Sequence, residues 1–577
     1  MNIQYIKAIA SLLLALSLFS CGDSEQKQAA DTIYHNGNIY TVNEQQPQVE
    51  AVAVKDGKII YAGDKAGAEA LRGSATTDFD LKGRTMTPGL TEGHGHFIGM
   101  GYHKLNLDLS SAKSYADVVD MVAEAAKDAA PGEWILGRGW HQDKWDQMPE
   151  NTVLGFQTHD DMSAVSPDNP VYLRHASGHA GFANAKAMEI AGVQPLSPEQ
   201  PGQVDVQGGE VFRDKLGNPT GIFNERAMTL ITKHIPEFTA EKNEQALLLA
   251  NQEALRHGIT SFHDAGIYQE TIDQYIAAID SGMLDVRIYA MLAGRDKELL
   301  QKWYERGPLL GYGDNHLTIR AIKMYMDGAL GSRGAWLLEE YSDQPGHFGH
   351  LTQPMEDLRE VADDALEHGF QVCSHAIGDR ANREVLDNYQ AAFAERPDKA
   401  KDHRFRVEHA QHLHPDDIPR FAEMNVIAAM QAIHMASDRP WAIDRLGQER
   451  IVNGAYVWQK LLQSGARIVN GSDVPVEPID PMASFYASVT RKTLKGTPEE
   501  GYEADQAMTR EQALRSYTLD AAYSAFEEDI KGSIAPGKLA DFAIFERDIM
   551  TVSEAALLNV AVDYTIIGGE VVYERKP

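Results

Sequence analysis

The segment Pro88-Gly89-Leu90-Thr91-Glu92-Gly93-His94-Gly95-His96 decides how this chain of 577 residues is expected to fold. It closes an apolar run of strand length and carries two histidines separated by one glycine. Side chains two residues apart on a β-strand point to the same side, so His94 and His96 can face one metal ion, and Gly93 and Gly95 leave room for it. A His-x-His pair alone is a weak signal. Whether this pair binds metal depends on whether other potential ligands lie at the ends of the other strands.

Strands and helices alternate through the middle of the chain. Segments with helical periodicity, such as 115–127 and 244–257, separate eight apolar runs of strand length. The eight candidate strands are residues 85–94, 259–263, 286–292, 319–326, 371–375, 405–409, 426–431 and 467–471. This alternation in this number predicts a (β/α)8 barrel of the TIM type. An insertion at about 103–238, with candidate strands at 134–136 and 171–173, is expected to form an α/β subdomain over the barrel mouth.

Both ends of the chain are β-rich. Asn36-Gly37 and Asp56-Gly57 near the start, and Gly568-Gly569 near the end, are turn signals between short strands. The two ends predict one composite β-sandwich of residues 31–88 and 530–577. Residues 89–102 and 239–529 remain for the barrel, and the predicted fold class is α/β.

Other candidate metal ligands stand at the ends of later strands. His375 ends the fifth candidate strand, His409 the sixth and Asp473 the eighth. Active sites of TIM barrels occupy the carboxyl-terminal face, so these side chains are expected to converge there with the His-x-His pair. Imidazole and carboxylate ligands suit zinc and related divalent metals without any cysteine. The sequence therefore predicts a metal site at one end of the barrel.

The order His-x-His, Lys, His, His, Asp resembles the amidohydrolase superfamily. Within it, the chain is most similar to the YtcJ-like amidohydrolases (amidohydrolase family 3), which include N-substituted formamide deformylase. The matching segments are residues 166–173, 178–180, 327–333, 375–381 and 471–475. The resemblance implies that the β-rich ends are the family's composite sandwich. One departure is Glu92-Gly93, because the family usually has an Asp or a similar residue before the His-x-His.

The resemblance also implies a role for each ligand. His94, His96 and Asp473 would hold one ion, and His375 and His409 a second. Lys323 matches a fourth-strand lysine that many relatives carboxylate to bridge two ions, and an unmodified ammonium there would repel metal. The alternative is that Lys323 pairs with a carboxylate such as Asp327. The expected cofactor is thus one or two divalent ions, with zinc as the expected metal.

Four residues are candidates for contact with the reacting groups. Asp473 would take a proton from the attacking water and return it to the leaving group. His434, near the seventh strand, would stabilise the oxyanion, or it is a solvated surface histidine. His179 and Arg333 lie in motifs shared with the family and would contact substrate, or each holds a loop by hydrogen bonding.

The first residues predict export. Residues 8–19 form an apolar run too short to span a membrane, and Leu18-Phe19-Ser20-Cys21 resembles a bacterial lipobox. We expect residues 1–20 to be a lipoprotein signal peptide, Cys21 to be lipidated and residues 21–30 to be a tether; the alternative is a plain secretory signal. Gly22 stands where an Asp would signal inner-membrane retention. The expected location is the periplasmic face of the cell envelope, anchored in the outer membrane.

The composition of the chain limits the classes of partner that it can bind. The formal charge of −31 argues against nucleic acid as a partner, and the expected partner is a small-molecule substrate. Membrane contact is expected only through the lipid anchor, and a homo-oligomer is left open. The leading hypothesis is hydrolysis of a carbon–nitrogen bond other than a peptide bond, in an amide, formamide or cyclic amide. The alternatives are an esterase or lactonase on the same metal site, or an inactive lipid-anchored binding protein, which should have lost ligands.

Overall fold

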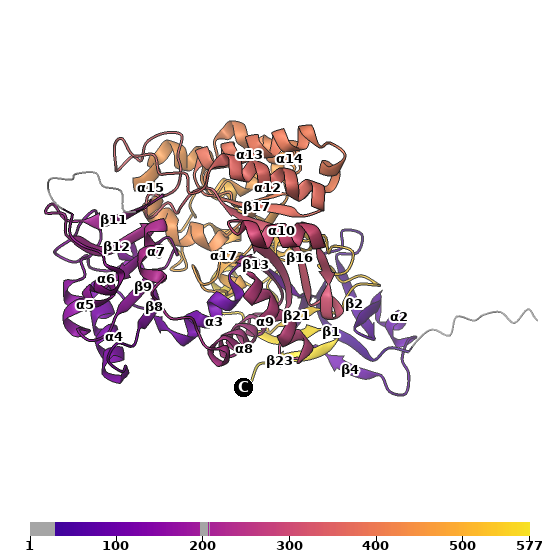
Figure 1. Cartoon of the computed structure of the whole chain (residues 1–577). Helices are drawn as coiled ribbons and strands as arrows, with labels where there is room; N and C mark the ends of the chain where they lie inside the picture. The colour runs from indigo at the N-terminus through magenta and orange to yellow at the C-terminus, as the bar shows by residue number, and fades with distance from the viewer. Residues whose placement is uncertain (1–28, 197–205, 207, 577) are drawn as a thin grey trace, which may run out of the picture.

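The computed structural model describes residues 29–196, 206 and 208–576. Its strands form three sheets that lie side by side: a central barrel, a sheet built from both chain ends and a sheet within the insertion (Figure 1). The expected signal peptide (residues 1–20) and the expected lipidation site Cys21 lie outside this range. None of the helices in the described ranges is long and apolar enough to cross a membrane.

Eight parallel strands form the predicted TIM-type barrel. They are β6 (Leu90–Gly95), β13 (Ile259–Ile267), β14 (Arg287–Ala293), β16 (Leu317–Tyr325), β17 (Gln371–Ala376), β18 (Arg406–His409), β19 (Ile427–Met430) and β20 (Ile468–Asn470). The short β15 (Leu309–Gly311) pairs antiparallel with β16. Each predicted strand is present because a buried apolar run gives way to a polar loop at its end.

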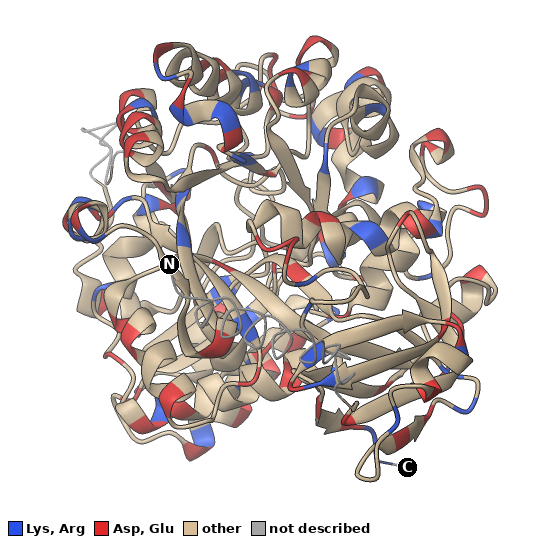
Figure 2. Cartoon of the chain, turned by 90° about the vertical axis from the view of Figure 1, so that its right-hand side faces the viewer, with Lys and Arg blue, Asp and Glu red and all other residues tan. Residues whose placement is uncertain are grey.

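Amphipathic helices cover the outside of the barrel. They include α8 (Ala240–Arg256), α9 (Gln269–Asp280), α10 (Lys297–Arg306), α12 (Met355–His368), α13 (Asp379–Glu395), α14 (Ile418–Glu423), α15 (Ala432–Gly454), α16 (Trp458–Ser464) and α17 (Pro481–Thr490). In α8, Thr239 caps the first turn by accepting a bond from the N–H of Lys242, and buried apolar residues recur every three or four positions. Basic and acidic residues intersperse on the outer helices (Figure 2).

The seam between β6 and β20 closes the barrel without a hydrogen-bonded ladder. A Cβ on Gly93 would lie 2.3 Å from the carbonyl oxygen of Asn470, so only glycine lets the two strands approach this closely. Glu92 crosses the seam, because its carboxylate accepts bonds from the N–H and the hydroxyl of Ser472, at 2.7 and 2.9 Å. Glu92, the departure from the family pattern, therefore joins the His-x-His strand to the loop that carries Asp473.

The two β-rich ends form one eight-stranded sheet. Its strands are β1 (Thr32–Tyr40), β2 (Gln48–Lys55), β3 (Lys58–Gly63), β4 (Thr77–Asp80), β5 (Thr85–Pro88), β21 (Phe542–Phe545), β22 (Val562–Ile567) and β23 (Glu570–Glu574). The turns at Asp56-Gly57 and Gly568-Gly569 are confirmed. The turn at Asn36-Gly37 is wrong: β1 continues through it with a bulge, and Asn36 takes a left-handed φ of 61°.

The first candidate strand divides between two sheets. β5 pairs with β1 and β21 in the terminal sheet, whereas β6 begins the barrel. The division falls at Gly89, whose N–H donates to the carbonyl of Asp541, while the N–H of Leu90 donates to Gly258. One apolar run in the sequence thus supplies a strand to the terminal sheet and a strand to the barrel.

A six-stranded sheet lies within the insertion, beside the barrel (Figure 1). Its strands are β7 (Leu107–Asp108), β8 (Ile135–Trp140), β9 (Val171–His175), β10 (Ala180–Ala183), β11 (Gly209–Arg213) and β12 (Pro219–Glu225). The helices α4 (Tyr115–Asp128), α5 (Asp160–Val165), α6 (Ala185–Ala191) and α7 (Thr229–Thr232) accompany it. Trp140 and Trp145 are buried in its own apolar core, so they hold the insertion together rather than line its surface.

Candidate active site

The six residues predicted as metal ligands meet at the carboxyl-terminal end of the barrel. They are His94 in β6, His96 directly after it, Lys323 in β16, His375 in β17, His409 at the end of β18 and Asp473 after β20. All six line one cavity. His409 and Asp473 have φ angles of 74° and 58°, which cost free energy in residues other than glycine and persist where the surrounding structure fixes them.

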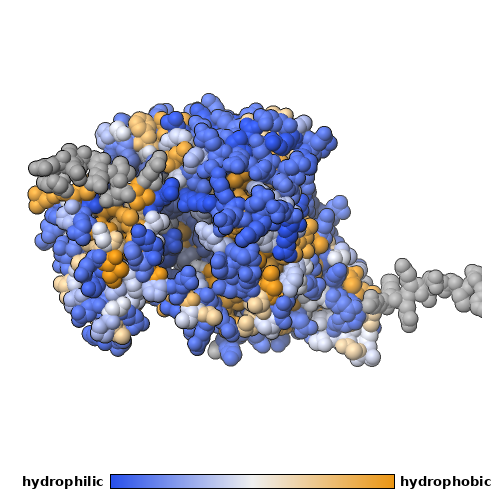
Figure 3. Space-filling view, in the orientation of Figure 1, coloured by the Kyte–Doolittle hydropathy of each residue, from blue (hydrophilic) through white to orange (hydrophobic). Residues whose placement is uncertain are grey.

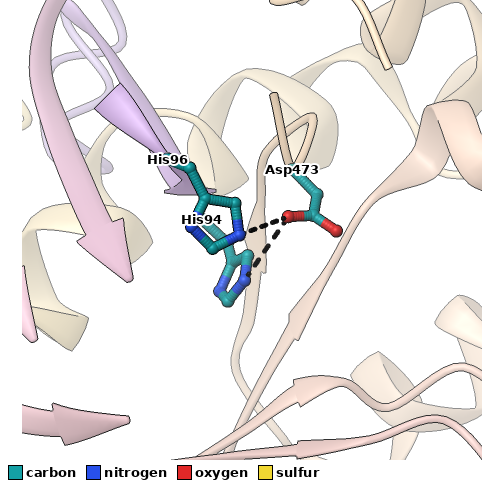
Figure 4. A group of neighbouring side chains, drawn as sticks. All are labelled: His94, His96 and Asp473. Atoms are coloured by element: carbon teal, nitrogen blue, oxygen red, sulfur yellow. Dashed lines mark ion pairs between the residues drawn. The ribbon is translucent and has the colours of Figure 1, made fainter. Parts of the chain in front are cut away.

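His94, His96 and Asp473 form a close group (Figure 4). The Nε2 atoms of His96 and His94 lie 3.3 and 3.7 Å from Oδ1 of Asp473. One potential ligand atom from each residue lies within 4.8 Å of the others. Oδ1 of Asp473 is buried and forms no hydrogen bond within the described residues. A buried oxygen of this kind requires a partner.

The spacing of this group fits a divalent cation. Nitrogen and oxygen ligands lie about 2.0–2.2 Å from zinc, which places tetrahedral ligand atoms about 3.3–3.6 Å apart. The separations of 3.3 and 3.7 Å between the imidazoles and Asp473 agree with this geometry. Burial lowers the pKa of His94 to about 4, so its imidazole is neutral near pH 7 and can offer a lone pair.

A buried ion pair between Arg406 and Glu408 lies behind His94 and orients it. This pair was not among the residues predicted from the sequence. Glu408 accepts a short hydrogen bond from Nδ1 of His94, which directs Nε2 toward Asp473. Arg406 grips both oxygens of Glu408, from Nε at 2.7 Å and from Nη2 at 2.8 Å. Both side chains are fully buried. The sequence feature that could have revealed the pair is the presence of two charged residues inside the otherwise apolar strand that ends at His409.

His375, His409 and Lys323 surround the space beside this group. The rings of His375 and His409 lie 4.4 Å apart, and Nδ1 of His409 is fixed at 2.8 Å from Oε1 of Gln431. Nε2 of His375 is buried and lies 3.3 Å from Oδ1 of Asp327, yet it forms no hydrogen bond to any residue that the structure describes. That these two imidazoles hold a second ion stays a prediction.

Lys323 points at His94, one of the predicted metal ligands. Its Nζ lies 3.0 Å from Nε2 of His94 and forms no ion pair with Asp327, a residue the structure also describes. Asp327 instead accepts bonds from the backbone N–H groups of Trp336, Ile377 and Gly378. Burial lowers the pKa of Lys323 to about 8. A substantial neutral fraction therefore exists near pH 8, and the neutral amine is the form that carboxylation requires.

The cavity has a volume of about 1640 Å³ and opens between the barrel and the insertion. Figure 3 shows the surface hollowed between these two parts. His179 and Glu225 from the insertion line it, with Nδ1 of His179 3.0 Å from Oε2 of Glu225. The His179 ring also lies 5.2 Å from that of His375. The insertion therefore supplies one wall of the site.

The two remaining candidate residues, His434 and Arg333, lie in different surroundings. His434 lines a smaller adjoining cavity together with Asp473, and its Nε2 is buried without a hydrogen-bond partner among the described residues. Arg333 does not line either cavity. It pairs with Asp343, with its Nη2 at 2.9 Å from Oδ2, so in this structure it holds a loop. Cys373, a free cysteine in β17, is buried.

Comparisons with known proteins agree with this architecture. The model of the "Amidohydrolase family" matches residues 79–573. The putative amidohydrolase YtcJ of Bacillus subtilis is 32% identical over 94% of this chain and 99% of its own length. N-substituted formamide deformylase of Arthrobacter pascens is 26% identical over 95% of this chain and 99% of its own. An uncharacterized metal-dependent hydrolase of Pyrococcus horikoshii has a solved structure with a TM-score of 0.72 and 28% identity, covering 91% of this chain and 99% of that one.

Proposed function

This chain belongs to the amidohydrolase family, and we propose that it is a metal-dependent hydrolase of carbon–nitrogen bonds other than peptide bonds, in an amide, formamide or cyclic amide. The observation that carries the proposal is the group of His94, His96 and Asp473, in which a buried carboxylate oxygen without a hydrogen bond among the described residues faces two imidazoles. The similarity to N-substituted formamide deformylase of Arthrobacter supports amide chemistry.

The chain's own residues account for the proton transfers. His94, His96 and Asp473 would hold a divalent cation, which when bound would supply an activated water, because such ions lower the pKa of water toward about 7. Asp473 accepts a proton as the water oxygen attacks the carbonyl carbon, and it delivers that proton to the leaving nitrogen as the carbon–nitrogen bond breaks. His434, whose Nε2 is unpartnered within the described part of the chain, donates to the carbonyl oxygen as negative charge develops there.

The test combines metal analysis with matched substrates. The protein without residues 1–21 is expressed with zinc, manganese or iron and assayed on N-substituted formamides, acetamides and cyclic amides, beside the corresponding esters and lactones. We expect bound metal, turnover of the nitrogen compounds and loss of both in His94→Ala. Faster cleavage of every ester would assign an esterase instead. Full metal content without turnover of any compound would assign a binding protein.

We propose further that the chain is anchored to the outer membrane, facing the periplasm, through a lipid on Cys21. The support is the sequence Leu18-Phe19-Ser20-Cys21 after a short apolar run. An exported enzyme meets small amides that enter the periplasm, so this location fits the proposed substrates.

A further inference from the structure

Two arginines of the insertion face the active-site cavity as direct neighbours. Arg138 in β8 and Arg174 in β9 are register partners on adjacent parallel strands, so their side chains leave the same side of the sheet. Both line the cavity that holds the predicted metal ligands. Like charges opposite each other on neighbouring strands are destabilising, so an anion bound between the two side chains would relieve their repulsion.

No ion pair supplies a compensating negative charge within the described residues. Arg138 donates from Nε to the carbonyl of Pro475 at 3.1 Å and from Nη2 to that of Ala176 at 2.7 Å. Arg174 donates from Nε and Nη2 to the carbonyl of Gly178. Neither guanidinium has an Asp or Glu oxygen within 4.0 Å in the described ranges. Many other arginines of this acidic chain are paired with carboxylates, so these two stand out.

The two guanidinium groups converge on one point. Nη1 and Nη2 of Arg138 and Nη2 of Arg174 all lie 3.5–3.6 Å from the position that a Cβ on Gly178 would occupy. Gly178 has a φ of 77°, a conformation that favours glycine, and its lack of a side chain leaves the space between the two groups free. The geometry is that of a fork for an anion, because paired guanidiniums offer several N–H donors to one oxygen cluster.

We infer that Arg138 and Arg174 form an anion-binding subsite that selects substrates carrying a carboxylate or phosphate group beside the bond to be cleaved. The inference rests on the proposed function for the cleavage itself, but the subsite makes its own binding prediction. The bond from Arg138 to Pro475 connects the subsite to the loop of Asp473. The anionic group of a substrate would thus orient it in the cavity that holds the metal ligands.

Binding of matched compounds tests the subsite apart from catalysis. The probes are N-acetyl derivatives of glycine, 4-aminobutyrate and 6-aminohexanoate, their neutral carboxamides, and N-acetyl-2-aminoethyl phosphate. Calorimetry measures their affinity for the wild type and for Arg138→Gln, Arg174→Gln and Lys297→Gln. Lys297 lines the same cavity, but Asp357 and Glu360 already balance its charge, so it is the matched control.

We expect at least one anionic probe to bind about tenfold or more tightly than its neutral partner, and each arginine variant to lose about tenfold. The carboxylate and phosphate arms identify which anion fits. Lys297→Gln should retain the preference. Arg174→Gln should unfold at the same or a higher temperature, because it removes a like-charge pair. Equal binding of charged and neutral probes, an unchanged preference in both arginine variants, or no binding of any anionic probe overturns the subsite. Absence of turnover with intact anion binding would reject only the proposed reaction.

Discussion

Replacing Glu408 by Gln should weaken metal binding without touching a metal ligand. The substitution preserves shape but removes the charge that Arg406 and Nδ1 of His94 both contact. Partners that orient a ligating histidine typically contribute 10–100-fold to metal affinity, which is about 1.4–2.8 kcal/mol. Loss of one member of a buried ion pair should also destabilise the metal-free protein by about 3–5 kcal/mol. The two effects need separate measurements.

The chain offers a matched control for that separation. Arg287 grips Asp541 through two hydrogen bonds, at 2.7 and 3.0 Å, and both side chains are almost fully buried. This pair joins the first residue of β14 to the terminal sheet, at the end of the barrel opposite the metal ligands. Asp541→Asn should therefore lose comparable stability and keep its metal affinity.

The assay is a competitive zinc titration of each folded variant against a chromophoric chelator, with urea unfolding of the metal-free proteins. Glu408→Gln should show a 10–100-fold weaker zinc affinity, and Asp541→Asn none of that loss. Unchanged zinc affinity in Glu408→Gln would refute the orienting role of the buried pair. Equal weakening in both variants would mean that loss of stability, rather than His94 orientation, controls the metal.

Three substitutions test the proton transfer, the buried Arg287–Asp541 pair and the lipid anchor. Asp473→Asn can still offer one oxygen to an ion but cannot accept a proton, so single-turnover rates should fall by about two to four orders of magnitude while most metal remains; a near-normal rate with full metal would remove Asp473 from the mechanism. Burial alone raises the pKa of Asp541, but Arg287 outweighs it and the pKa is lowered. The pair should therefore stabilise the fold above about pH 4, and the stability difference between wild type and Asp541→Asn should shrink as the pH falls through the folded pKa; a difference independent of pH from about 6 to 2 would contradict this. Cys21→Ser should release the protein into the soluble periplasmic fraction, and its retention in the membrane pellet would reject lipidation.

The sequence was informative where burial and periodicity coincide. All eight barrel strands are present because each is a buried, largely apolar run between polar loops. Sequence reasoning could place His375 and His409 at strand ends for the same reason. It did not give the roles of Glu408 and Arg138, because those roles depend on which strands become neighbours. It also misread Asn36-Gly37, since a bulge and a hairpin turn favour the same residues.

The terminal sheet can be completed only after the last part of the chain has been synthesised. β5 lies between β1 and β21, so one of its two neighbours belongs to the last part of the chain to be synthesised. Until the ribosome has made β21, the nascent chain carries an open strand edge directly before the histidines of β6. Such distant pairing slows folding and leaves the edge free to meet other chains. A protein shortened at its carboxyl terminus would keep every metal ligand and still lack the strand that covers this edge.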